Sequence, residues 1–222
     1  MEFKLDTKAA TAADQIAGRI DETGKYIGAI VHAFGFTTDK GTQGVEIAFK
    51  DDSGKQADYL RLYTAKAGGE PLSGYRTLQA LMTCLSLRGL QSQRGTIKLF
   101  DSQTKQREDF DVDLFPELTG KRVGFLLQHE EYEKRDGGIG AQMNVYAVFQ
   151  ADTELTASEV LGRKTSPELL GKMVATLRDK PLRSAAGAGA RGKPAASQPA
   201  AQQRQAATSS TGFDDMDDDI PF

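Results

Sequence analysis

Apolar and polar residues alternate with period two along much of the chain, a pattern typical of half-buried β-strands. Residues 26–36 carry apolar side chains on both faces, and in residues 44–49 Val, Ile and Phe alternate with Gly, Glu and Ala. The polar run 51–55 then has the composition of a hairpin loop, and alternation resumes at 57–63. These segments predict a meander of three antiparallel strands.

The third of these strands has two faces of different chemistry. Leu60 and Leu62 lie on one face, and Tyr59, Arg61 and Tyr63 lie on the other. Two aromatic rings that flank a guanidinium form a surface on which planar groups such as nucleobases can stack. In the alternative interpretation the two tyrosines pack beneath a neighbouring loop.

Strands are also predicted at residues 96–100, 110–115, 123–128 and 142–149. In the first of them Lys98 and Phe100 share a face, which repeats the basic and aromatic pattern of the third strand. The polar connection that follows carries Lys105 and Arg107. A second, glycine-rich connection at 134–140 begins with Lys134 and Arg135. Both connections are candidate flaps beside a binding groove, or ordinary solvated hairpin tips.

Three helices complete the predicted elements. Ser73 can cap a helix whose apolar stripe is Leu78, Leu81, Met82 and Leu85, with Gly89 placed to end it. Thr156 and Glu159 have the spacing of a capping box, and Ser166 followed by Pro167 predicts the start of a third helix that reaches Leu177. A single helix within a run of antiparallel strands favours a mainly β fold, an antiparallel barrel of the oligonucleotide-binding (OB) type with helices at its C-terminal end. A β-sandwich would produce the same pattern.

Composition divides the chain near Arg183. Residues 184–212 contain no Val, Ile, Leu, Met, Phe or Tyr and are rich in Ala, Gly, Ser, Gln and Pro, so they cannot build a core. We therefore predict a folded domain at 1–183, a disordered linker at 184–212 and an acidic tip at 213–222.

Charge and cysteine content restrict the function classes. The 222-residue chain has a net charge of −3, and the single cysteine, Cys84, cannot form a disulfide within the chain. We expect a protein of the reducing cytoplasm, without a membrane segment, in which Cys84 is a packed residue. A nearly neutral domain binds nucleic acid only if its basic residues are grouped and stacking supplies much of the affinity.

Catalytic chemistry finds little support in the sequence. Asp109, Asp111 and Asp113 alternate on one strand face and could hold a divalent ion, as in a nuclease, if further ligands lay nearby. His32 and His129 are isolated in sequence and are interpreted as structural. We expect no cofactor, no resident metal and no enzymatic activity.

The acidic tip contains five aspartates in seven positions and closes with Ile220, Pro221 and Phe222. A terminal carboxylate beside an aromatic ring suits capture by a partner protein that has a basic-rimmed apolar pocket. The residues that would bind the partner form one continuous run: Asp217, Asp218, Asp219, Ile220, Pro221 and Phe222.

This run is similar to the C-terminal tip of bacterial single-stranded DNA-binding proteins, which recruits enzymes of replication, recombination and repair. Residues 115–128, 130–132 and 143–146 resemble phage-encoded single-stranded DNA-binding proteins. The chain departs from the bacterial proteins in having no tryptophan, so stacking would fall to Tyr and Phe.

The resemblance implies a non-catalytic protein that coats single-stranded DNA without sequence preference, in the bacterial cytoplasm if the protein is phage-encoded. The candidate DNA-binding residues are Tyr59, Arg61, Tyr63, Lys98, Phe100, Lys105, Arg107, Lys134 and Arg135. The alternative is an adaptor or inhibitor whose tail occupies the partners' pocket. The sequence leaves open whether the chain forms a homo-oligomer.

Overall fold

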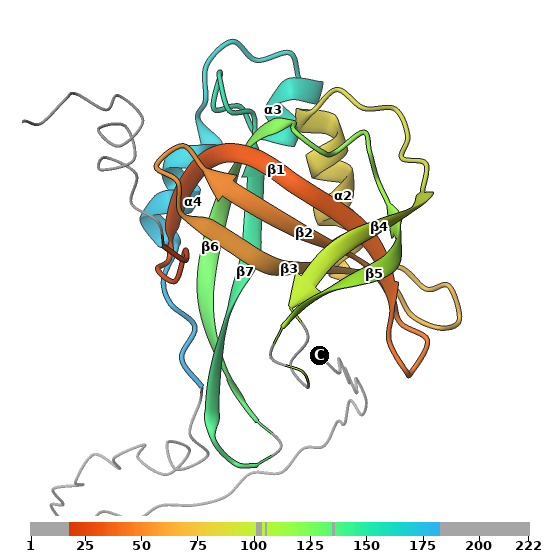
Figure 1. Cartoon of the computed structure of the whole chain (residues 1–222). Coiled ribbons are helices and arrows are strands. Elements are labelled where there is room, and N and C mark those ends of the chain that lie inside the picture. Colours follow the sequence, from red (N-terminus) through yellow and green to blue (C-terminus); the bar gives the residue numbers. More distant parts are fainter. Residues whose placement is uncertain (1–17, 101–103, 105, 135, 183–222) are drawn as a thin grey trace, which may run out of the picture. The chain divides into compact units, whose positions relative to one another are not determined.

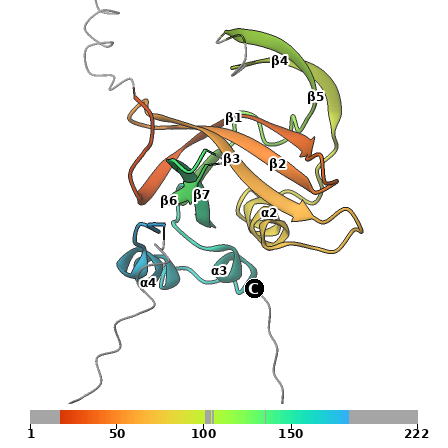
Figure 2. The same cartoon turned by 90° about the horizontal axis from the view of Figure 1, so that it is seen from below.

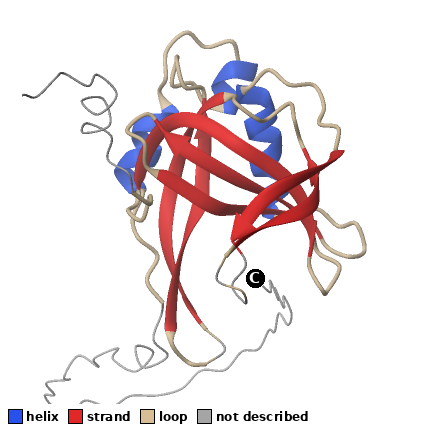
Figure 3. Cartoon of the chain, in the orientation of Figure 1, coloured by secondary structure: helices blue, strands red, loops and turns tan. Residues whose placement is uncertain are grey.

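The computed structural model describes residues 18–100, 104, 106–134 and 136–182. Strands outweigh helices in this part of the chain, as Figure 3 shows, so the expected mainly β class is confirmed. All the strand pairs are antiparallel and belong to one seven-stranded sheet. No helix among the described residues has the length and apolar character needed to cross a membrane.

The predicted meander is present and consists of β1 (Gly24–Thr37), β2 (Gln43–Asp51) and β3 (Gln56–Ala65). The two faces of the meander have the chemistry that the alternation predicts. Val45, Ile47, Leu60 and Leu62 are buried in the core, whereas Tyr59, Arg61 and Tyr63 of β3 are exposed to solvent.

Strand β1 is long enough to pair with two different strands along one edge. Its first half, from Gly24 to Ala29, pairs with β6 (Arg122–Glu133), and its second half pairs with β5 (Arg107–Leu114) at Phe34 and Gly35. β5 forms a hairpin with β4 (Gln93–Phe100), and β6 forms one with β7 (Ile139–Phe149). The sheet therefore divides at β1 into two hairpin arms.

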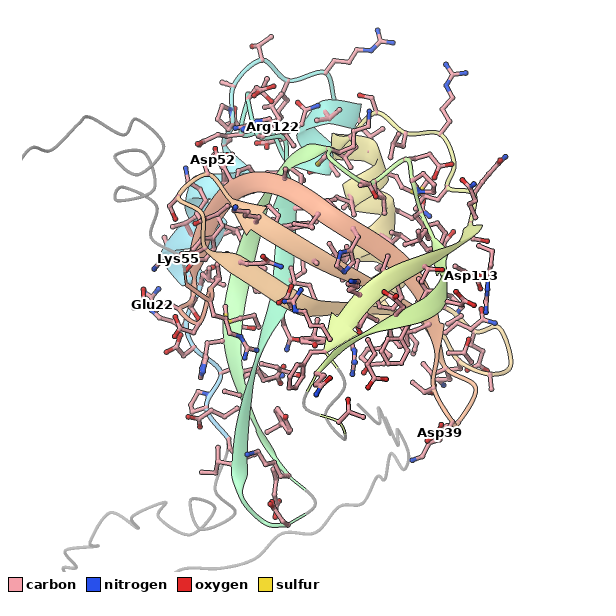
Figure 4. The ribbon with its side chains drawn as sticks, in the orientation of Figure 1. Glu22, Asp39, Asp52, Lys55, Asp113 and Arg122 are labelled. Atoms are coloured by element: carbon pink, nitrogen blue, oxygen red, sulfur yellow. The ribbon has the colours of Figure 1, made fainter. Side chains whose placement is uncertain are left out.

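The expected barrel is not closed. The strand order runs β3-β2-β1-β5-β4, with β6 and β7 branching from β1, and no ladder joins β3 to β7 among the described residues. The arm made by β6 and β7 crosses behind the meander instead (Figure 1). Arg122, at the start of β6, donates two hydrogen bonds of 2.9 Å to the carboxylate of Asp52 in the β2–β3 loop (Figure 4).

Helix α2 (Ser73–Cys84) and the β4–β5 hairpin lie on opposite faces of the meander (Figure 2). α2 follows the predicted apolar stripe, with Leu81 fully buried, but it ends at Cys84 and not near Gly89. Gly74 brings the helix against β3, because a Cβ atom there would lie 2.4 Å from the carbonyl oxygen of Tyr63. Cys84 is buried, as expected, and burial raises the pKa of its thiol to about 11.

Glu159 organises the C-terminal helices α3 (Ala157–Leu161) and α4 (Leu169–Thr176). Its carboxylate accepts hydrogen bonds from the backbone N–H and the hydroxyl of Thr156 at the start of α3, at 2.9 and 2.8 Å. It also accepts from the N–H groups of Glu168 and Leu169, at 2.7 and 2.9 Å. One carboxylate thus satisfies donors at the beginnings of two helices. The prediction that Ser166 and Pro167 open α4 is wrong, because the helix begins at Leu169.

We predict that this carboxylate makes the fold sensitive to acid. The backbone N–H of Thr156, followed by those of Glu168 and Leu169, lowers the pKa of Glu159 from 4.5 to about 2. A depressed carboxyl pKa contributes stability that is complete above pH 4.5 and is lost as the pH falls toward 2. Glu159→Gln should therefore lower the urea midpoint at neutral pH, and its difference from the wild type should shrink below pH 4.5. Parallel pH profiles for the two proteins would contradict this role.

The close approach of α2 to β3 gives a second stability prediction. Gly74→Ala should cost about 1–3 kcal/mol in the free energy of unfolding, because the added methyl group overlaps the backbone of Tyr63. Gly171, in α4, is the matched control, since a Cβ atom there meets nothing within 4 Å. Gly171→Ala should be neutral or stabilising by up to about 1 kcal/mol. Equal effects of the two substitutions, measured by urea unfolding, would contradict the packing role of Gly74.

Candidate nucleic-acid interface

A groove lies between the exposed face of the meander and the β4–β5 hairpin, which arches over that face in Figure 2. Its main part has a volume of about 470 Å³ and continues into a smaller hollow that shares Glu46, Tyr59, Leu99 and Phe100. Asp39, in the β1–β2 loop, contributes to one end of the groove (Figure 4). The groove is therefore built by strands that are distant in sequence.

Aromatic side chains are concentrated in this groove. Seven Tyr and Phe side chains are exposed among the described residues, and four of them line it: Tyr59, Tyr63, Phe100 and Phe110. Their exposed fractions lie between 37% and 48%, so each ring keeps a solvent-accessible surface. Phe34 and Phe36 of β1 are the other two aromatic residues that line the main part of the groove. Such a row of partly exposed rings has a large capacity for stacking.

The backbone directs Tyr59 into the groove. The register between β2 and β3 shifts between Ile47 and Phe49, so Asp58 and Tyr59 form a β-bulge in β3. Tyr59 has a φ of 62°, which is uncommon for a bulky residue and is tolerated only when the surroundings stabilise it. Bulges of this kind re-aim side chains next to functional sites.

Arg61 lines the groove and is held there by Glu46 and Phe36. Its Nε donates a 2.6 Å hydrogen bond to the nearly buried carboxylate of Glu46, and its guanidinium lies 5.7 Å from the centre of the Phe36 ring. Phe36 meets Tyr63 edge-on, with ring centres 5.5 Å apart. Burial opposes the charge of Arg61, but the hydrogen bond and charge of Glu46 outweigh it and raise the pKa of the guanidinium. Arg61 is therefore a fixed cation beside two rings.

A glycine makes room for this cluster. Gly44 is the cross-strand partner of both Phe36 and Tyr63. A Cβ atom at Gly44 would lie 2.5 Å from the Phe36 ring, so the ring lies directly over the glycine. A larger residue here would displace Phe36 and with it the support under Arg61.

The smaller hollow mixes charges of both signs. His32 lies there with Lys98, Arg107 and Asp58. Burial lowers the pKa of His32, an effect that Asp58 and Glu46 oppose and Arg107 reinforces. Lys98 is the cross-strand partner of Asp109, and Arg107 is that of Phe100. The groove is thus close to neutral in charge and rich in rings.

Six of the nine predicted binding residues meet in this groove: Tyr59, Arg61, Tyr63, Lys98, Phe100 and Arg107. The tyrosines do not pack beneath a loop. Lys134 lies elsewhere, in the tight β6–β7 turn, where its N–H donates to the carbonyl of Gly138. Lys105, Arg135 and the tip residues 217–222 lie outside the described residues.

Sequence reasoning missed the contribution of β1 and β5. His32, Phe34 and Phe36 recur at every second position of β1 and line the groove, as does Phe110 of β5. The i, i+2 spacing of the first three was visible, but the apolar residues between them hid which face they share.

Two of the three aspartates of β5 have other partners. The carboxylate of Asp111 accepts a 2.7 Å hydrogen bond from the Thr96 hydroxyl, and Asp113 lies 3.6 Å from the guanidinium of Arg94. Within the described ranges, no group of three or more His, Cys, Asp or Glu side chains is arranged to hold a metal ion.

The sequence matches no protein-family model, and comparison with curated proteins gives no significant match.

We predict that Arg61 has a structural as well as a binding role. Arg61→Met leaves the Glu46 carboxylate, whose side chain is 7% exposed, without its cation, and should cost about 1–3 kcal/mol in the free energy of unfolding. Adding Glu46→Gln should recover part of that loss, because the uncompensated charge is removed. As a control, Arg122→Met breaks an ion pair exposed on both sides and should change the urea midpoint little. A cost for Arg61→Met no larger than the control's would refute the structural role.

Proposed function

We propose that the protein binds single-stranded DNA without strong sequence preference, in the groove between the β1–β3 face and the β4–β5 hairpin. The observation that carries the proposal is the gathering of four partly exposed rings from three strands around Arg61. Every nucleobase has a flat face, so rings that stack on bases bind a strand of any sequence.

The charge of the groove favours a single strand over a duplex. A duplex keeps its bases stacked on one another and presents phosphates, so its recognition depends on a basic surface. Here Lys98 and Arg107 share the smaller hollow with Asp58, and Asp39 lines the main part of the groove. Rings in a nearly neutral groove suit unstacked bases better than a phosphate backbone.

The strand arrangement gives further support. β1, β2, β3, β6 and β7, with α2 between β3 and β6 in the chain, correspond in order to an OB-type barrel that is open between β3 and β7. Partly open barrels of this type bind oligonucleotides across the face of their second and third strands. Tyr59, Arg61 and Tyr63 lie on that face of β3.

We also propose that the protein has no catalytic role and that residues 217–222 recruit proteins of DNA replication, recombination or repair. This part of the proposal rests on the sequence alone: an aspartate run followed by Ile220, Pro221 and Phe222. An adaptor that carries the same segment without binding DNA is the competing hypothesis.

Fluorescence anisotropy with a labelled oligo-dT of about 30 nucleotides tests the DNA-binding proposal, beside a duplex of equal length. We expect binding to the single strand that weakens with added salt, and much weaker binding to the duplex. Tyr59→Ala or Phe100→Ala should each weaken single-strand binding by roughly 5- to 150-fold, corresponding to about 1–3 kcal/mol per stacked base.

Tyr75→Ala is the matched control. Tyr75 is 46% exposed, similar to Tyr59 and Phe100, but it belongs to α2, on the other side of the meander. Its substitution should leave the affinity unchanged. If the three variants lost affinity equally, or none did, the groove would not be the binding site. If the wild type failed to bind at low salt, the adaptor hypothesis would take precedence.

A further inference from the structure

The gap between β3 and β7, which keeps the barrel open, forms a second hollow of about 310 Å³. We call it the β3–β7 seam. Arg61 and Tyr63 line both the seam and the aromatic groove, so the two hollows meet at the edge of β3. A strand bound in the groove would have to pass over this edge to reach the seam.

The seam differs from the groove in its chemistry. Where the groove presents rings, the seam presents hydrogen-bonding side chains: Ser73 and Thr77 from α2, Glu130 from β6, and Gln142 and Asn144 from β7. Hydrogen-bonding groups distinguish one base edge from another, whereas stacking rings do not.

The Asn144 amide has a fixed orientation. Its Nδ2 donates a hydrogen bond to the carboxylate of Glu130. The same carboxylate forms an ion pair with Lys180, with 2.5 Å between Nζ and Oε1. A carboxylate held by a cation offers only acceptors, so the amide oxygen of Asn144 cannot take the place of its nitrogen. Glu130 therefore commits Asn144 to presenting its Oδ1, an acceptor, away from the carboxylate.

We propose that the β3–β7 seam binds one nucleobase by its edge and favours a base that carries an exocyclic amino group. Oδ1 of Asn144 accepts from the N4 amino group of cytosine or the N6 amino group of adenine. Thymine and uracil present the O4 carbonyl at the corresponding position, and two acceptors repel. Asn144 is thus a specificity-determining residue, and Glu130 is the residue that positions it.

This inference rests on the proposed function and adds to it a preference at one nucleotide. Stacking in the groove supplies affinity for every sequence, and the seam modulates that affinity at a single position. The protein would then bind all single strands, but not equally.

Oligo-dC and oligo-dU of equal length test the preference in anisotropy titrations near neutral pH. Both are pyrimidine strands, and their bases differ at the hydrogen-bonding edge and not in a methyl group. We expect the wild type to bind oligo-dC about fivefold more tightly, the worth of one hydrogen bond to a base. Equal affinities for the two strands would overturn the seam proposal and leave the proposed function standing.

Two variants separate the seam from the groove. Asn144→Ala should bring the dC-to-dU affinity ratio close to one, because it removes both the hydrogen bond to the cytosine amino group and the repulsion of the uracil O4 carbonyl. Glu130→Gln should reduce the same ratio, because a glutamine can also donate and so lets the Asn144 amide turn over.

Tyr59→Ala is the control for the groove: it should weaken binding to both strands equally and preserve the ratio. A ratio that survives Asn144→Ala would overturn the assignment of Asn144. Failure of the wild type to bind either strand would overturn both the seam and the proposed function. Circular dichroism of each variant checks that the strands remain folded.

Discussion

The sheet depends on the way β1 shares its hydrogen bonds. A strand has two edges, and β1 gives one of them entirely to β2 while dividing the other between β6 and β5. This division sends the two hairpins in different directions. The β6–β7 arm packs over the core, and the β4–β5 arm swings across the opposite face (Figure 2). Both the groove and the seam exist because the two arms separate at β1.

The core and the groove use the same strands on opposite faces. Ile47 and Leu60 anchor β2 and β3 to the core with no exposed surface, while their neighbours Glu46, Tyr59 and Arg61 point into the groove. Gly74 and Gly44 allow close contacts on the two sides: helix against strand at the first, ring over backbone at the second. The rings are therefore displayed on a support that is already packed.

Local alternation predicted much of the meander and the site. Tyr59, Arg61 and Tyr63 stand at every second position beside the apolar Leu60 and Leu62, so one short segment reveals both faces of the strand. The same reasoning did not identify which face of β1 lines the groove, because β1 is apolar on both faces.

Long-range features were not predictable in this way. Barrel closure depends on hydrogen bonds between β3 and β7, whose register no local pattern encodes. The predicted start of α4 was wrong because the backbone N–H groups at its beginning donate to the Glu159 carboxylate. Glu159 lies nine residues before Glu168 in the chain. In each case the deciding partner is distant in sequence.

The β4–β5 hairpin contributes no side chain to the buried core among the described residues, and it joins β1 through only two paired positions. The side of the groove that the hairpin forms is therefore not constrained by packing in the core. Substitutions in this arm can accumulate at little cost to the stability of the domain, whereas those on β2 and β3 cannot. The groove thus has one side, on β2 and β3, that folding holds constant, and one side, on the β4–β5 hairpin, that can vary. Related chains could therefore change their ligand specificity through the hairpin alone.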